Sequence, residues 1–314
     1  MRKIFIIAAL LVSVSATAQV QFTQYYLDGT QYNPALAGSR GALCSGFSGR
    51  QQWMGMTDPE DNAIAPLSMV FSVHAPLYSI KSGIGLNVIY DKLAFESNTG
   101  IKLNYAYHIP LQQEKSQLSI GVGVSVINRS VAFDKLITEQ GGDPLLKINS
   151  PENGLLPDFD LGVSFHRLKK FSVSLSAANL LESSTEIGNV KSANNRQIYI
   201  LSDYRIKVTE DKRQSLYIIP SVFIKANQQN VQFDLSSRLE FNNRYWAGLS
   251  YRYQDAVAIV GGLNFNGFRI EASYDLSIGK LSPATNGSVE IFIGYCYPIM
   301  PKVKLNSLYN TRYL

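Results

Sequence analysis

Residues 231–241 read Val-Gln-Phe-Asp-Leu-Ser-Ser-Arg-Leu-Glu-Phe, and this stretch decides the fold. Apolar and polar residues alternate along it, which is the period of a β-strand whose two faces meet different surroundings. One face carries Val231, Phe233, Leu235, Leu239 and Phe241, and the other carries Gln232, Asp234, Ser236, Arg238 and Glu240. A strand that is apolar on one side and charged on the other fits a wall between lipid and water.

The same alternation recurs from residue 41 onward, while no segment keeps the spacing of an amphipathic helix. It is clear at 67–73, 118–126 and 268–276. The pattern predicts about fourteen strands, an even number typical of single-chain bacterial barrels, each near the ~9–11 residues that cross a membrane when tilted. We place them near 41–50, 66–74, 83–91, 99–109, 116–127, 158–166, 171–178, 196–208, 215–226, 231–241, 244–254, 256–265, 267–276 and 287–297.

The connections between these strands support the same fold. Counted from the N-terminus, the odd-numbered connections include the long segments 51–65, 128–157 and 179–195. The even-numbered ones include 167–170 and the tight Asn-rich or Asn-Gly turns at 242–243 and 266–267, which have hairpin chemistry. Long loops at one end and short turns at the other are typical of outer-membrane barrels. We therefore predict an all-β, closed antiparallel transmembrane barrel.

The N-terminus reads as a signal peptide over residues 1–18. Arg2 and Lys3 precede a short apolar run, and the small residues 16–18 form a cleavage site. We therefore divide the chain into the signal peptide 1–18, a periplasmic or plug segment 19–40, an outer-membrane barrel 41–297 and a periplasmic tail 298–314. The signal peptide and the barrel together predict that the protein lies in the outer membrane of a Gram-negative bacterium.

Composition agrees with a barrel and disfavours other classes. The chain has 18 Tyr, 15 Phe and 23 Gly, and after the leader no apolar run approaches the roughly 20 residues of a membrane helix. The net charge of +5 falls to +3 without Arg2 and Lys3, which is too small to indicate nucleic acid. An interfacial girdle is expected from outward-facing tyrosines. These are Tyr105, Tyr107, Tyr245, Tyr251, Tyr253, Tyr295 and Tyr297.

Charged residues fall at positions that face the lumen of the predicted barrel. The candidates are Lys102, Asp234, Arg238, Arg252, Arg269 and Glu271. They would either set the selectivity of a channel or fill the lumen with salt bridges, and the sequence leaves both readings open. His74, His108 and His166 also have lumen parity. No nucleophile-elbow or HExxH motif accompanies them, so we predict no enzyme, no metal site and no cofactor.

The two cysteines suggest a covalent seam. Cys44 and Cys296 lie near the same ends of the first and last predicted strands, which must pair to close the barrel, and both have lumen parity. A disulfide between them would lock the barrel, provided that the register brings their Cα atoms within ~7 Å. Two free thiols are the alternative.

Three motifs resemble the PorP/SprF family. They are Asn33-Pro34-Ala35-Leu36-Ala37-Gly38-Ser39-Arg40, Arg50-Gln51-Gln52-Trp53, and the pair Ser273-Tyr274-Asp275-Leu276-Ser277 and Asn286-Gly287-Ser288-Val289-Glu290. The resemblance extends from Gln19 to the last strand. It implies an outer-membrane component associated with type IX protein secretion and gliding, and no catalysed reaction.

Asn33 is expected to cap a helical turn that starts at Pro34, and Gly38 to let the chain turn into the first strand. The segment 19–40 is then either a plug or periplasmic docking element, or a plain lead-in to the barrel. Trp53 either anchors a partner or sits at the membrane interface. Candidate partner contacts are Asn33, Pro34, Gly38, Arg40, Arg50, Trp53, Lys302 and Lys304.

Two functional classes follow. The first is a secretion component that supports export or surface anchoring of particular substrates. Its partners would be outer-membrane lipid, secretion-machinery proteins, periplasmic peptidoglycan-associated proteins and an adhesin-type substrate, without nucleic acid. The second is a channel for small or hydrophobic solutes.

Overall fold

The computed structural model describes residues 21–58, 63–111, 115–133, 151–168, 170–187, 190–211 and 214–299. The predicted signal peptide 1–18 and the tail from residue 300 onward, including Lys302 and Lys304, lie outside these residues. Among the described residues, no helix is long and apolar enough to cross a membrane.

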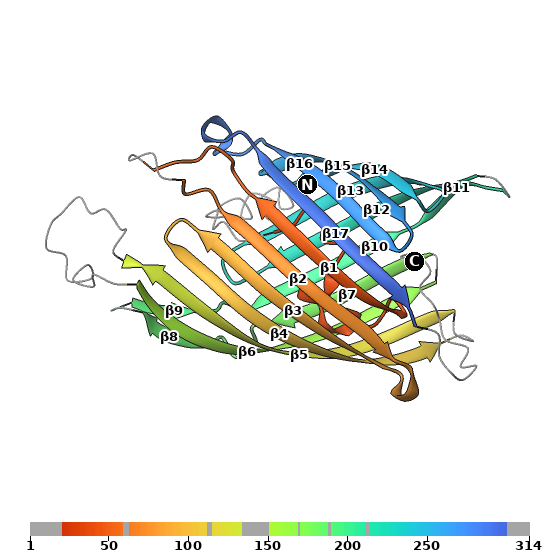
Figure 1. The fold of residues 1–314 in the computed structure, drawn as a ribbon, viewed down its shortest axis with the longest axis horizontal. Helices are drawn as coiled ribbons and strands as arrows, with labels where there is room; N and C mark the ends of the chain where they lie inside the picture. The colour runs from red at the N-terminus through yellow and green to blue at the C-terminus, as the bar shows by residue number, and fades with distance from the viewer. Residues whose placement is uncertain are drawn as a thin grey trace, which may run out of the picture.

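Antiparallel strands form one closed ring (Figure 1). In chain order they are β1 (Ala42–Gln51), β2 (Leu67–Leu77), β3 (Ser82–Leu93), β4 (Glu96–Leu111), β5 (Ser116–Ala132), β6 (Pro151–Arg167), β7 (Phe171–Ala178), β10 (Gln197–Tyr204), β11 (Ile206–Glu210), β12 (Ser215–Ala226), β13 (Val231–Phe241), β14 (Tyr245–Arg252), β15 (Ala256–Phe265), β16 (Phe268–Ser277) and β17 (Ser288–Pro298). β10 and β11 form one barrel strand interrupted at Arg205, and β10 closes the ring by pairing with both β7 and β12. The predicted fourteen-strand barrel is confirmed.

The strands begin and end close to the predicted positions, with two exceptions. β5 and β6 pair from Ser116↔Arg167 as far as Ala132↔Pro151, so both continue several residues beyond their predicted ends. A separate hairpin of β8 (Ser184–Ile187) and β9 (Val190–Ala193) lies in the predicted loop 179–195. The alternation that identified the strands weakens in these stretches, which explains why they were missed.

The two faces of the wall have opposite chemistry. On β13, Asp234, Arg238 and Glu240 are buried inside, whereas Leu235 and Leu239 are exposed outside. All seven predicted girdle tyrosines are exposed on the outer surface. The charged residues of β13 therefore face the lumen and the predicted girdle tyrosines face outward, as the alternation predicts.

The barrel has two different ends, called the loop end and the turn end. At the loop end β1, β5, β7 and β16 finish and β2, β6, β10 and β17 begin, and the turn end carries the connections 78–81, 242–244 and 266–267. At the turn end, Asn242 and Asn243 both have positive φ, as do Asn266 and Gly267, which matches the primed turns of tight hairpins.

Residues 21–41, called the lumen segment, run inside the ring of strands (Figure 1). Two short 3-10 helices, η1 (Gly29–Gln31) and η2 (Pro34–Leu36), shape this segment. The side chain of Asn33 accepts a hydrogen bond from the nitrogen of Ala35 at 2.9 Å, with Pro34 in the first position of η2. The predicted cap is therefore confirmed, and Gly38 and Gly41 both adopt φ +71° before β1 begins.

Candidate functional site

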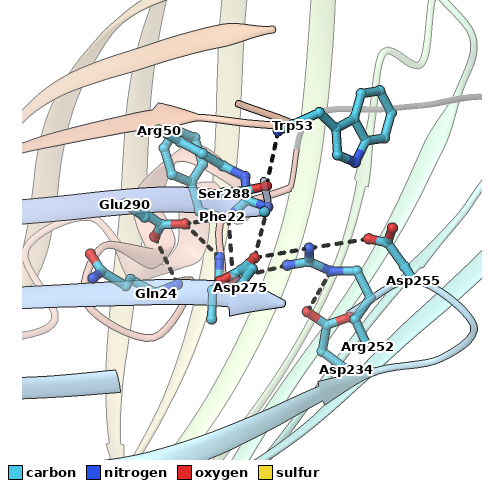
Figure 2. Close-up of polar contacts among 12 residues, drawn as sticks. Phe22, Gln24, Arg50, Trp53, Asp234, Arg252, Asp255, Asp275, Ser288 and Glu290 are labelled. Carbon is cyan, nitrogen blue, oxygen red and sulfur yellow. Dashed lines mark hydrogen bonds and ion pairs between the residues drawn. The ribbon is translucent and has the colours of Figure 1, made fainter. Parts of the chain in front are cut away.

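The lumen segment and the wall that holds it form the candidate site. Near the loop end, a cluster of buried charges surrounds the beginning of the segment (Figure 2). Arg50 of β1 contacts Asp275 of β16 at 2.8 Å and Glu290 of β17 at 3.0 Å. Arg252 of β14 contacts Asp234 at 3.1 Å and Asp275 at 3.4 Å. Buried charges are stable only when paired in this way, so the cluster requires all of these strands in register.

Thr23 of the lumen segment lies at the centre of this cluster. Its hydroxyl donates to Asp275 at 2.8 Å and accepts hydrogen bonds from Arg50 at 3.3 Å and Arg252 at 3.1 Å. The main-chain nitrogens of Thr23 and Gln24 each donate to one oxygen of Glu290 at 2.9 Å. The cluster thus binds the beginning of the segment as well as the strands of the wall.

The loop after β1 is paired with the loop before β17 above the same cluster. The nitrogen of Trp53 donates to the Ser288 hydroxyl at 3.1 Å, and the nitrogen of Met54 donates to the Gly287 carbonyl at 2.8 Å. Trp53 has φ +49° and its side chain is only 9% exposed. This turn folds the chain back over the barrel end and covers most of Trp53, and its role as a partner anchor or a membrane-interface residue stays a prediction.

Aromatic residues hold the next part of the segment. Tyr25 stacks on Phe223 with ring centroids 4.8 Å apart, and Arg238 lies 3.4 Å from the ring centroid of Tyr26. The Tyr26 hydroxyl donates to Glu271. Burial raises the pKa of Tyr26 well above its ordinary value, and the Glu271 carboxylate raises it further, so the phenol is protonated and remains a donor.

The wall holds the following residues through their main chain. Asn104 donates to the Thr30 carbonyl at 3.2 Å, and Lys102, which is also paired with Asp160, donates to the Gln31 carbonyl at 2.9 Å. The Ser176 hydroxyl donates to the Tyr32 carbonyl at 2.7 Å. Three strands of the wall, β4, β6 and β7, therefore contribute to this part of the site.

Asn33 to Gly38 lie flat against glycines of the wall. A Cβ atom added to Gly121 would stand 2.2 Å from the nitrogen of Ala35, and one added to Gly162 would stand 2.0 Å from Oδ1 of Asn33. A Cβ on Gly83 would stand 2.1 Å from the carbonyl oxygen of Ala37. Each distance is far shorter than a van der Waals contact, so this wall admits the segment only because it lacks side chains there.

The side chain of Asn33 also joins the segment to two strands. Its Nδ2 donates to the carbonyls of Val163 on β6 and Leu175 on β7, both at 3.1 Å. His108 contacts the Ala37 carbonyl at 3.1 Å, and Nδ1 of His74 accepts from the nitrogen of Gly38 at 3.3 Å. Two of the three predicted lumen histidines thus bind the main chain of the segment. Within the described residues, no group of three or more potential ligands is arranged to hold a metal ion.

The predicted lumen residues all lie inside the barrel. Lys102, Asp234, Arg238, Arg252, Arg269 and Glu271 are each at most 6% exposed. Arg269 lies over the ring of Trp246, and Glu271 accepts from Trp246 and Tyr26. These contacts match the second alternative, in which the charged residues fill the lumen with paired side chains. A cavity remains between the lumen segment and β6, β7 and β10, lined on the wall side by Ser164, His166, Ser172, Ser174 and Asp203.

Five of the predicted partner contacts lie at the lumen. Asn33, Pro34, Gly38 and Arg50 are buried inside the barrel, and Arg40 is half-buried. They pack against the wall because the chain turns inward before β1, and their role as partner contacts stays a prediction.

Cys44 and Cys296 face each other across the β1–β17 seam. They are register partners with Cα atoms 4.1 Å apart, and their sulfur atoms are joined in a disulfide. Six residues further along β1, Arg50 is the register partner of Glu290. The first and last strands are thus linked by a disulfide near the turn end and by an ion pair near the loop end.

Some residues of this site had no signal in the sequence. Thr23 is an unremarkable polar residue until the structure places it between two arginines. Gly121 and Gly162 carried a weak signal, since glycines at lumen positions of a strand indicate a close approach of another chain segment. Asp275 and Glu290 belong to the C-terminal motif, although nothing in it indicated contact with the N-terminal segment.

Comparison with solved structures shows the same fold. The chain is similar to the CymD monoaromatic hydrocarbon channel, with a TM-score of 0.50 and 9% identity over 93% of this chain and 99% of that one. It is also similar to a FadL homologue of Pseudomonas aeruginosa, with a TM-score of 0.46 and 10% identity over 85% and 93% of the two chains. The toluene transporter TbuX of Ralstonia pickettii gives a TM-score of 0.46 and 10% identity over 87% and 93%.

No curated protein sequence matches the chain. A family model does, and it covers residues 14–295, which include the lumen segment, the charged cluster and nearly all of the barrel. Residues of the three motifs that suggested this family either contact the lumen segment or belong to it: Arg50, Asp275 and Glu290 bind its beginning at the loop-end cluster, and Asn33–Gly38 lie in it against the glycine wall. The chain belongs to the PorP/SprF family of type IX secretion system membrane proteins and has the fold of an outer-membrane β-barrel.

Proposed function

We propose that this protein supports the export or surface anchoring of particular substrates of the type IX system and catalyses no reaction. In this role it spans the outer membrane with its turn end toward the periplasm, and the lumen segment blocks the lumen. Its partners are secretion-machinery proteins, periplasmic peptidoglycan-associated proteins and an adhesin-type substrate.

The observation that carries the proposal is that residues of all three motifs either contact the lumen segment or belong to it. Arg50 and Glu290 come from two of the motifs and bind Thr23 and Gln24, while the Asn33–Gly38 stretch is the third motif. Residues of the motifs that resemble the family thus hold a segment inside the barrel rather than line an open passage. This favours a barrel whose lumen is blocked and which works through contacts with other proteins.

The cavity beside β6, β7 and β10 favours the second candidate, a channel for small or hydrophobic solutes. In that case Lys102, Arg238 and Glu271, with the other buried charges, would set selectivity. A channel would require the lumen segment to move, since its residues occupy the space between opposite walls.

Crosslinking in outer membranes, mild detergent extraction and mass spectrometry test the proposal. We expect secretion-machinery proteins or one large exported adhesin to be recovered with the barrel. Deletion of the gene is expected to remove particular proteins from the cell surface or to stop gliding, with solute uptake unchanged. Recovery of the barrel alone, together with normal secretion and a steady conductance in planar bilayers, would instead establish the channel.

A further inference from the structure

The part of the lumen around Thr30–Gly38 recognises polypeptide main chain. The carbonyls of Thr30, Gln31 and Tyr32 accept from Asn104, Lys102 and Ser176. The Ala37 carbonyl and the Gly38 nitrogen bind His108 and His74. Main-chain groups are the same in every polypeptide, so these contacts do not depend on the side chains at positions 31, 32, 37 and 38.

The shape of the wall limits which segments fit. Gly83 and Gly121 bring the wall to within contact of the main chain of residues 34–38, and Gly162 brings it to within contact of the side chains of Asn33 and Pro34. Small residues are required at positions 35 and 37, both fully buried, whereas Leu36 is only half-buried and borders the cavity. An asparagine at position 33 is required to reach the carbonyls of Val163 and Leu175.

We infer that this region is a binding site for a polypeptide segment of the form Asn-Pro-small-any-small-Gly, and that residues 30–38 are its resident occupant. A segment of the same chemistry supplied by another protein can take the site when the resident segment leaves. The inference deepens the proposed function and rests on it for the identity of the chain that brings the segment.

The beginning of the lumen segment is held differently, by contacts specific to its side chains. Thr23 fits between two arginines and Asp275, Tyr25 stacks on Phe223, and Tyr26 binds Glu271. This half therefore keeps the resident segment in place, while the Asn33–Gly38 half accepts the more general ligand.

Peptide exchange in the full-length protein tests the inference. A specific protease site is inserted between Arg40 and Gly41, and the chain is cut after the barrel has folded, which removes the advantage that the tether gives to the resident segment. A labelled peptide of residues 21–40 is then added. We expect saturable binding to the cut protein and none to the uncut protein.

Competing peptides define the ligand. A peptide with Tyr25→Ser and Tyr26→Ser should still compete, weakened roughly 10-fold or more because two aromatic contacts are lost. A peptide with Ala35→Leu and Ala37→Leu should compete at least about 100-fold less well than the native one, since its side chains cannot fit against the glycine wall. In the cut protein, Gly121→Val should abolish binding. Gly261→Val, where an added Cβ meets nothing closer than 4.0 Å, should not.

Failure of the native peptide to bind, or equal competition by the bulky peptide, would overturn the inference. If the insertion prevents folding, the exchange is measured on uncut Glu290→Gln protein at higher peptide concentration, with the same two criteria. If the peptide binds as expected but a deletion strain secretes normally, the proposed function fails and the peptide site stands. If the peptide does not bind but the deletion strain loses secretion, the peptide site fails and the proposed function stands.

Discussion

At the residue scale, Glu290 connects the first strand, the last strand and the lumen segment. Its carboxylate binds Arg50 and the nitrogens of Thr23 and Gln24, and it is 1% exposed. Glu290→Gln should lower the free energy of unfolding by about 3 kcal/mol, the lower end for a broken buried pair, because Asp275 still neutralises Arg50. Urea unfolding of the barrel in lipid vesicles measures the change.

Glu182 offers a matched control for that substitution, because its ion pair with Arg196 is exposed at the barrel surface. Glu182→Gln should change the unfolding free energy by no more than about 0.5 kcal/mol. Equal effects of the two substitutions would mean that the buried cluster does not stabilise the barrel.

Tyr26 gives the docking of the lumen segment a dependence on alkaline pH. Its pKa is raised in the docked state by burial and then by Glu271, so docking favours the protonated phenol. The stabilisation is complete below the ordinary tyrosine pKa of about 10 and declines as the pH rises above it, because only the released segment ionises there. Proteinase K should therefore cut within residues 21–41 faster at pH 11 than at pH 9, after correction for enzyme activity. In Tyr26→Phe the cleavage rate should rise less between pH 9 and pH 11. A rise equal to that of the unsubstituted protein would show that Tyr26 is not the cause.

At the element scale, the lumen segment packs closely against β3, β5 and β6 because these strands have glycines at the points of contact. Gly121→Val should force Asn33–Ala37 off the wall while leaving β5 paired, because valine is a good strand residue. We expect new protease cleavage within residues 21–41 of a barrel that still shows heat-modifiable gel mobility. Gly261→Val, whose added Cβ meets nothing closer than 4.0 Å, should keep the segment protected. Loss of the barrel itself in Gly121→Val would mean that the wall needs the docked segment to form.

At the scale of the whole molecule, closure joins residues 252 positions apart. The disulfide between Cys44 and Cys296 links the first strand to the last, so it constrains nearly the entire unfolded chain. By loop-closure entropy, Cys44→Ser with Cys296→Ser should cost up to about 5 kcal/mol of unfolding free energy. Intact mass should rise by two hydrogen atoms when a thiol reductant reduces the native protein. Two freely alkylated thiols in unreduced protein would show that the seam is held by hydrogen bonds and the Arg50–Glu290 pair alone.

The sequence by itself determined the fourteen barrel strands and which of their residues face the lumen, although not the β8–β9 hairpin or the full length of β5 and β6. Alternation is a local property, so Asp234 and Leu235 have opposite environments whatever the rest of the chain does. The Asn33 cap is equally local, since it involves residues only two apart.

Only the tertiary structure decided what the lumen contains. A one-residue slip between β1 and β17 would separate Cys44 from Cys296 and Arg50 from Glu290, so these pairs depend on the register of closure. Trp53 is buried, and Thr23 reaches Arg252, because the chain folds inside its own barrel and across 229 positions of sequence. Periodicity carries no information about contacts of that range, which arise only when fourteen strands close around the segment that precedes them.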